Sequence, residues 1–148
     1  MNTQSNTYTF VYAAIMVVIV AALLSFAAMS LKPFQDKNVE VEKKRSILSS
    51  VNIGLDVNEQ PDKNTYIEEL YDKHIVESFI VNTKGDKLQG DAFTVDLQKE
   101  MAKPVDQRLL PVFVSKQADG ATNVILPMRG KGLWGPIWGY IALESDFN

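Results

Sequence analysis

Hydrophobic positions are spread very unevenly along this chain, and the longest apolar run lies near the N-terminus. Residues 10–31 carry no charged side chain, and the polar side chains within the run are Tyr12, Ser25 and Ser30. In an α-helix with a rise of about 1.5 Å per residue, this run covers roughly 33 Å, close to the hydrocarbon thickness of a bilayer. The pattern predicts one membrane-spanning helix at residues 10–31, preceded by a short N-terminal segment at residues 1–9.

A cleaved signal peptide is the alternative interpretation of the same run. Signal peptides begin with a basic region, have a shorter apolar core and end at small residues. Residues 1–9 contain no Lys or Arg, and the run is longer than a typical signal core, although residues 27–30 would serve as a cleavage sequence. A retained span is therefore favoured.

Charged and apolar positions with helical spacing follow the apolar run. Glu40 and Lys44 have the i,i+4 spacing of a helical ion pair, and Gly54 stands where a helix can stop. We expect a membrane-proximal helix within residues 32–56.

A second, shorter helix is expected after the polar loop at residues 58–64. Ile67, Leu70, Tyr71 and His74 have the i, i+3, i+4, i+7 spacing of one helical face. Asn64 or Thr65 is the expected N-cap, with Glu68 and Glu69 in the first turn. His74, the single histidine, is interpreted as a structural residue at the end of this helix.

Strand-like segments fill most of the remaining chain, where β-branched and aromatic residues cluster between turn residues. The predicted strands cover residues 75–81, 111–114, 123–127 and 137–143. The second and third are joined by an Asp-Gly turn and should form a hairpin. Before them, Phe93, Val95 and Leu97 alternate with polar neighbours, which predicts a half-buried segment. Residues 57–148 are therefore expected to form one small α+β domain.

Composition excludes several kinds of chemistry. The 148 residues carry a net charge of −3, which does not favour a nucleic-acid-binding protein. There is no cysteine, so disulfides, thiolate metal sites and cysteine nucleophiles are excluded. A single histidine also argues against a histidine metal site or a Ser-His-Asp triad. We assign no catalytic residue and no metal ligand.

Glycine and tryptophan are concentrated near the C-terminus. Half of the eight glycines and both tryptophans lie in ten residues, at Gly130, Gly132, Trp134, Gly135, Trp138 and Gly139. Glycine lets a backbone approach a ligand closely, and tryptophan supplies flat apolar area. The segment could wall a flat aromatic cofactor, or it could be a tight loop followed by a strand packed in a sheet core.

The order of these features resembles a known family. The apolar span and charged helix are followed by a strand and turn, by Val-Ile-Leu-Pro-Met-Arg-Gly-Lys-Gly-Leu-Trp-Gly at residues 124–135, and by Ala-Leu-Glu-Ser-Asp at residues 142–146. Over essentially its whole length, the chain resembles the C subunit of the bacterial sodium-translocating NADH:quinone oxidoreductases, an FMN-binding-domain family related to the G subunit of the Rnf complexes.

The resemblance implies a function, a cofactor and partners. It implies a membrane-anchored, flavin-carrying electron-transfer subunit that assembles with the other subunits of a sodium-pumping NADH:quinone reductase and is not catalytic on its own. Gly132, Leu133 and Trp134 are the residues we expect around noncovalently held FMN. The alternative is a non-catalytic, membrane-anchored module for assembly or sensing.

One departure from the family pattern concerns covalent flavin. In the family, FMN is joined to a threonine in a Ser/Thr-Gly-Ala-Thr motif that lies beyond the glycine-tryptophan segment. Here the similar residues 119–122, Asp-Gly-Ala-Thr, precede that segment and have Asp where Ser or Thr is required. A hairpin turn explains them fully, so Thr122 is interpreted as a lookalike and no covalent FMN is expected.

Two explanations are open for the missing motif: a fragment of a longer gene product, or a short form that has lost covalent flavin. The fragment is favoured, because residues 137–143 have the composition of a strand that needs further sheet partners and residues 144–148 do not read as a domain terminus. A fragment would expose sheet edges and apolar faces.

Orientation in the membrane is predicted differently by two arguments. The basic residues that follow the span would keep the domain in the cytoplasm under the positive-inside rule, namely Lys32, Lys37, Lys43, Lys44 and Arg45. The family resemblance instead implies a single pass through the bacterial cytoplasmic membrane, with a cytoplasmic N-terminus and an extracytoplasmic domain. We favour the orientation implied by the family.

Overall fold

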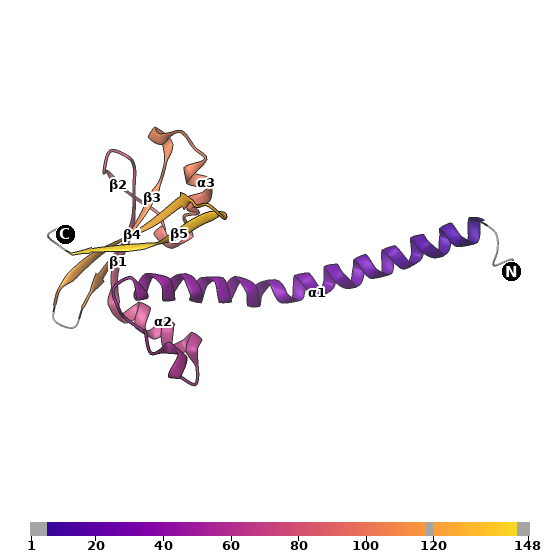
Figure 1. Ribbon diagram of the computed structural model, residues 1–148, viewed down its shortest axis with the longest axis horizontal. Helices are drawn as coiled ribbons and strands as arrows, with labels where there is room; N and C mark the ends of the chain where they lie inside the picture. Colours follow the sequence, from indigo (N-terminus) through magenta and orange to yellow (C-terminus); the bar gives the residue numbers. More distant parts are fainter. Residues whose placement is uncertain (1–5, 118–119, 145–148) are drawn as a thin grey trace. The chain divides into compact units, whose positions relative to one another are not determined.

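A computed structural model describes residues 6–117 and 120–144, and Figure 1 shows its helices and strands. The chain divides into two compact units, residues 1–40 and 41–148. In chain order the elements are α1 (Asn6–Ser49), η1 (Val57–Glu59), α2 (Lys63–His74), β1 (Ile75–Val81), β2 (Lys87–Leu88), η2 (Ala92–Thr94), α3 (Leu97–Met101), η3 (Val105–Gln107), β3 (Leu110–Lys116), β4 (Thr122–Lys131) and β5 (Pro136–Glu144).

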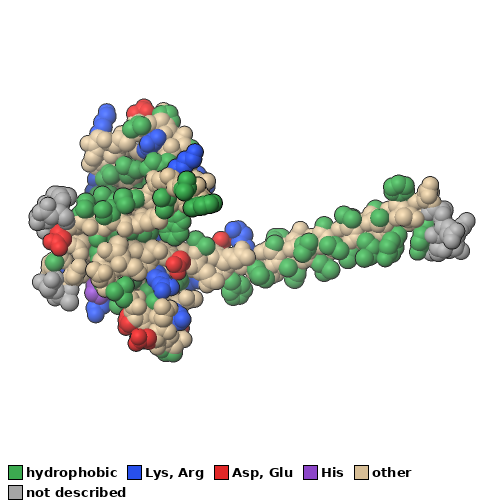
Figure 2. Space-filling view, viewed as in Figure 1, with side chains coloured by type: hydrophobic (Ala, Val, Ile, Leu, Met, Phe, Trp, Pro, Cys, Tyr) green, Lys and Arg blue, Asp and Glu red, His purple; other side chains and the backbone are tan. Residues whose placement is uncertain are grey.

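The first unit consists of the N-terminal part of α1. Within the described residues, α1 is the one helix that is long and apolar enough to cross a bilayer. Hydrophobic side chains cover its surface (Figure 2). The apolar run and the charged residues that follow it lie on this one helix, because α1 continues through Pro33 for 44 residues. The ring of Pro33 removes one backbone donor, and the turns on both sides keep their own hydrogen bonds.

The second unit is an α+β domain, as predicted. Its five strands form one sheet in the order β2-β1-β3-β4-β5, and every neighbouring pair is antiparallel. Strand β1 has the predicted bounds, and β3 pairs with β4 as the predicted hairpin. Strand β4 extends further than predicted, to Lys131, because its second half pairs with β5.

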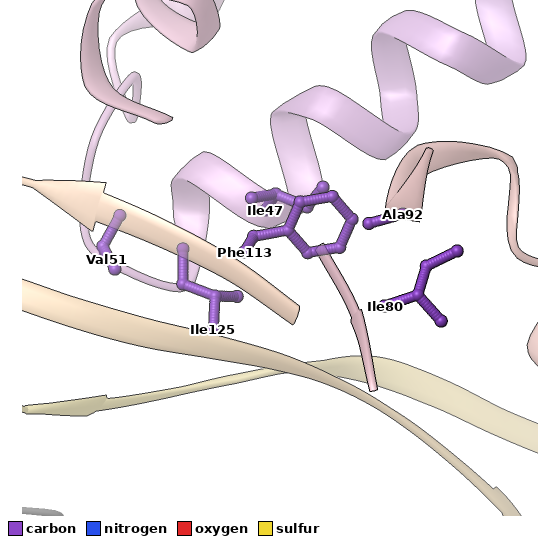
Figure 3. Packing of buried hydrophobic residues seen from close by; sticks show 6 residues of the cluster. All are labelled: Ile47, Val51, Ile80, Ala92, Phe113 and Ile125. Atoms are coloured by element: carbon purple, nitrogen blue, oxygen red, sulfur yellow. The ribbon is translucent and has the colours of Figure 1, made fainter. Parts of the chain in front are cut away.

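One face of the sheet, here called the inner face, carries the larger core cluster. Phe113 and Ile125 are fully buried in it and pack with Ile47 from the last turns of α1, as Figure 3 shows. Ile80 and Ala92 complete one side of this cluster. A second cluster joins α1 to the start of the domain through Val41, Leu48, Val57 and Ile67. The C-terminal turns of α1 are therefore part of the domain's core.

The N-terminus of α2 differs from the sequence-based expectation. Neither Asn64 nor Thr65 is the N-cap: the side chain of Asp62 accepts a hydrogen bond from the Thr65 backbone N–H at 3.1 Å. The helix therefore begins at Lys63, and Glu68 and Glu69 lie beyond its first turn. The Asp62 carboxylate also accepts a bond from the Thr65 hydroxyl at 2.8 Å, which explains why this earlier residue caps the helix.

The segment before β3 is half-buried, as its alternation predicts. Phe93, Val95 and Leu97 are partly buried while Thr94 and Asp96 are exposed. The backbone here forms the short helices η2 and α3, each capped by an aspartate side chain. The predicted residues Asp119, Ser145 and Asp146 of the motifs quoted above lie outside the described part of the chain.

His74 ends α2, as expected, and is half-buried. Its Nδ1 lies 3.1 Å from the carbonyl oxygen of Lys116, and this contact joins α2 to the end of β3.

Candidate functional site: the β4–β5 hairpin and the cleft on its inner face

The glycine-tryptophan segment forms a long hairpin with a tight tip. Strands β4 and β5 pair continuously from Asn123 opposite Glu144 to Lys131 opposite Pro136. The tip is closed by a 2.8 Å hydrogen bond from the Gly132 N–H to the Gly135 carbonyl. A Cβ on Gly132 would lie 2.8 Å from Cγ1 of Ile137, and Gly135 has a φ of +151°. Both glycines are thus required by the turn itself.

Large apolar side chains project from this tip into solvent. Leu133 is 92% exposed and Trp134 is 97% exposed. Gly132, Leu133 and Trp134, the residues expected around FMN, are thus together at the tip, where neighbouring side chains cover them very little. Two adjacent large apolar side chains with this exposure, continuous with the exposed Ile137 and Trp138, make the tip a candidate contact surface.

The alternative interpretation of this segment is a tight loop followed by a strand packed in the sheet core. The structure has the tight loop, but the first part of the strand is exposed. Strand β5 lies at the edge of the sheet, and Ile137 and Trp138 are each more than 60% exposed. The strand joins the core farther along, at Tyr140 and Ala142, because the inner-face cluster reaches only that far.

A cleft of about 310 Å³ lies between the inner face of β3–β5 and the η2–α3 segment. The strand wall is formed by Phe113, Pro127, Arg129, Trp138 and Tyr140, and the facing wall by Thr94, Val95, Leu97 and Gln98, with Lys43 of α1 also lining it. The Arg129 guanidinium donates a 3.0 Å hydrogen bond to the Gln98 side-chain oxygen, which links β4 to α3 across the cleft.

Lys43 brings a half-buried cation to this cleft. Its Nζ lies 4.4 Å from the centre of the Phe93 ring and donates a hydrogen bond to the Phe93 carbonyl. Burial lowers the pKa of the Lys43 amine, and the nearby carboxylates of Asp91 and Asp96 oppose that shift.

Tyr140 supplies an aromatic ring and a proton donor to the same cleft. Its ring meets that of Phe113 edge-on, with centroids 6.4 Å apart. Burial raises the pKa of Tyr140 to about 12, so its hydroxyl keeps the proton at neutral pH.

Gly120, Ala121 and Thr122, the described residues of the Asp-Gly-Ala-Thr segment, lie at the opposite end of β4 from the hairpin tip. Gln117 donates to the Ala121 carbonyl at 2.8 Å, Gly120 has a φ of +86°, and Thr122 pairs with Lys116. The described residues on the two sides of this turn pair as a hairpin, as expected, and residues 118 and 119 lie outside the described chain. No group of three or more metal-binding side chains occurs among the described residues.

The residues expected from the sequence around FMN lie at the hairpin tip, and the cleft was not predicted from the sequence. The cleft combines residues from α1, α3 and two strands, such as Lys43, Gln98 and Trp138, which come together only through the sheet register. The one local signal for it was the alternation at Phe93, Val95 and Leu97.

Comparison with known proteins gives a consistent result. No family model matches the chain. The C subunit of the Na(+)-translocating NADH-quinone reductase of Haemophilus ducreyi is 28% identical over 99% of this chain and 61% of its own length. The corresponding protein of Pseudomonas aeruginosa is 26% identical over the same shares.

A solved structure agrees with these relatives. The crystal structure of the C subunit of the Na(+)-translocating NADH-quinone reductase from Parabacteroides distasonis superimposes with a TM-score of 0.65 and 37% sequence identity. The resemblance to this C subunit is confirmed. The superposition covers 78% of this chain and 52% of that structure, so the chain spans about half to three-fifths of the length of the C subunits it matches.

Proposed function

We propose that this chain is a membrane-anchored electron-transfer subunit of a sodium-translocating NADH:quinone reductase and that its β4–β5 hairpin and cleft hold FMN. The observation that carries the proposal is the similarity to the C subunit along 99% of the chain. The apolar helix α1 supports the anchoring, and the exposed aromatic hairpin beside a cation-lined cleft supports the cofactor. The partners would be the other subunits of that complex and the bilayer.

The residues of the cleft fit a flavin in chemical type. A planar ring needs flat apolar walls, which Trp138, Tyr140 and Leu97 provide. An anionic group needs cations, which Lys43 and Arg129 provide at the cleft. FMN, when bound, supplies the ability to accept and pass on electrons.

The protein's own contribution would be to bind and orient the cofactor and to exclude water. Leu133 and Trp134 would cover the part of the ring that projects beyond the cleft. The protonated Tyr140 hydroxyl can donate a hydrogen bond to a ring acceptor at neutral pH, since its pKa lies near 12. Arg129 is held by Gln98 and would present a fixed charge to the anionic group.

Flavin binding can be tested on the purified chain in detergent. Addition of FMN should quench tryptophan fluorescence with saturation, and Trp134→Ala or Arg129→Gln should weaken binding at least tenfold, equivalent to about 1.4 kcal/mol. Leu55→Ala is the matched control, because Leu55 is 65% exposed and does not line the cleft. Unsaturable quenching, or equal binding by all variants, would contradict the proposal and favour the alternative assembly or sensory module.

Covalent attachment is tested separately. We propose that Thr122 carries no flavin, because the turn around it lacks the Ser/Thr of the family motif. Denatured protein should therefore show no flavin fluorescence under ultraviolet light in a gel. A fluorescent band that disappears in Thr122→Ala would contradict this part of the proposal.

A further inference from the structure

The sheet has a second face, opposite the inner face, that is also apolar. Residues directly paired across β4 and β5 point to the same side, and the pairs Val124–Leu143 and Leu126–Ile141 alternate with the inner-face pair Ile125–Ala142. We call the side chains of Val124, Leu126, Met128, Ile137, Ile141 and Leu143 the outer face. None of the six is polar or charged.

The outer face is not part of either core described above. The two clusters of buried residues in the described chain draw on the inner face, on α1 and on α2, and include no member of the outer face. Met128 is 53% exposed, Ile137 is 61% exposed and Ile141 is 39% exposed.

In an antiparallel sheet with one solvated face, apolar and polar residues alternate along each strand, so that the polar residues form the face in contact with water. The central parts of β4 and β5 lack that alternation, since residues 124–127 and 140–143 carry no charged side chain and are apolar or aromatic on both faces. Contiguous apolar surface of this kind on a folded domain marks an interface.

We propose that the outer face binds an amphipathic polypeptide segment that belongs to the part of the C subunit for which this chain has no counterpart. The relatives contain such a part, because 99% of this chain corresponds to only 61% of the Haemophilus ducreyi protein and 78% of it to 52% of the Parabacteroides distasonis structure. A lipid surface fits less well. Binding to anionic membranes relies on several Lys or Arg around the apolar patch, whereas β4 and β5 carry none on this side of the sheet and β3 carries Lys116, opposite Thr122.

This inference rests on the similarity to the C subunit and not on flavin binding. The outer face and the cleft lie on opposite sides of the sheet and share only Met128, so Leu126 and Ile141 can be altered without changing a residue that lines the cleft. A chain that fails to bind FMN would still be expected to bind the segment.

The test uses this chain in detergent and, as a separate polypeptide, the portion of the Parabacteroides distasonis protein that this chain does not match. The chain contains no cysteine, so Met128→Cys provides one site for an environment-sensitive dye. Addition of the segment should shift the dye emission to the blue with saturation. Light scattering should give a one-to-one complex.

Two substitutions separate the outer face from other exposed apolar surface. Ile141→Glu and Leu126→Glu should each weaken binding at least tenfold, whereas Leu55→Glu should leave it unchanged. Circular dichroism checks that each variant stays folded, and Ile137→Glu, at the most exposed position, serves where another variant unfolds. No association with the segment, a dimer of this chain that Ile141→Glu dissociates, or binding to phospholipid vesicles that Ile141→Glu abolishes would each overturn the proposal.

Discussion

At the scale of single residues, the stability of the domain depends on a few side chains at the centre of the inner face. Phe113 is fully buried, lies in the middle strand of the sheet and contacts α1, η2 and the Tyr140 ring through its cluster. Such a residue joins elements that have few other contacts with one another. Its removal tests whether the inner face is the main core.

Replacement of Phe113 by Ala is expected to lower the free energy of unfolding by about 3–5 kcal/mol, because it removes a large buried ring and leaves a cavity. Leu55→Ala, at a position that is 65% exposed, should change it by less than about 0.5 kcal/mol. Chemical denaturation in detergent, followed by circular dichroism, measures both. Similar effects for the two variants would show that the core lies elsewhere.

Tyr140 should make stability depend on pH in the alkaline range. Its pKa is raised to about 12 in the folded state and is about 10 in an unfolded chain, so the unfolded state loses its proton first. The contribution of the Tyr140 hydroxyl to the free energy of unfolding is complete below pH 10 and is lost as the pH rises towards 12. In Tyr140→Phe the decline of unfolding free energy between pH 10 and 12 should be shallower, by on the order of 1 kcal/mol after allowance for partial exposure. An unchanged decline in denaturation curves would contradict this assignment.

Residue types predicted chemistry better than they predicted individual contacts. The exclusion of cysteine chemistry follows from composition alone, and the Asp-Gly turn before Thr122 follows from local backbone preference. The N-cap of α2 was wrong by two to three residues, because Asp62, Asn64 and Thr65 are all suitable caps and only the path of the chain selects among them.

At the scale of secondary structure, the end of α1 shows how local geometry positions the domain. After Ser49 the chain turns through Asn52, with a φ of +60°, and Gly54, with a φ of +70°. These left-handed residues end the helix and direct the chain towards η1 and α2. Gly54 also approaches the side chain of Leu70, where a Cβ would lie 3.2 Å from Cδ1.

Gly54→Ala is expected to destabilise the domain by about 1–2 kcal/mol, because alanine is strained at positive φ. Gly130→Ala is the matched control: its φ is not left-handed and a Cβ there meets open space. It should be neutral or slightly stabilising. Thermal denaturation compares the two, and equal melting temperatures would refute the role given to Gly54.

Strands were the elements best predicted from sequence, and the reason is physical. The β-branched residues of β1 and the alternation in β3 are local signals of a pleated surface. The cleft depends instead on which residues of β4 and β5 are paired, and on α3 packing near them, and neither is encoded within a short window. The hairpin tip was found because its glycines and tryptophans are adjacent in sequence.

At the scale of the whole molecule, the membrane topology remains a prediction with two opposed arguments. The basic residues after the apolar run favour a cytoplasmic domain, and the likeness to the C subunit favours an extracytoplasmic one. We predict the extracytoplasmic domain, and labelling in cells tests this orientation.

The absence of cysteine makes that measurement direct. Lys84→Cys places a thiol in the exposed turn between β1 and β2, and Thr7→Cys places one before the apolar run. With the domain outside, a membrane-impermeant maleimide should label the thiol at position 84 in intact spheroplasts and the thiol at position 7 only after permeabilisation. The reverse pattern would establish a cytoplasmic domain.

The continuity of α1 also determines where a protease could cut the helix and release an intact domain from the membrane. Ile47 and Leu48 are completely buried and lie on the same helix as the apolar run. A proteolytic cut before Val41 would release the domain with both clusters of buried residues intact. A cut after Leu48 would remove Ile47 from one cluster of buried residues and Val41 and Leu48 from the other. The released fragment would then be prone to unfolding, aggregation and degradation.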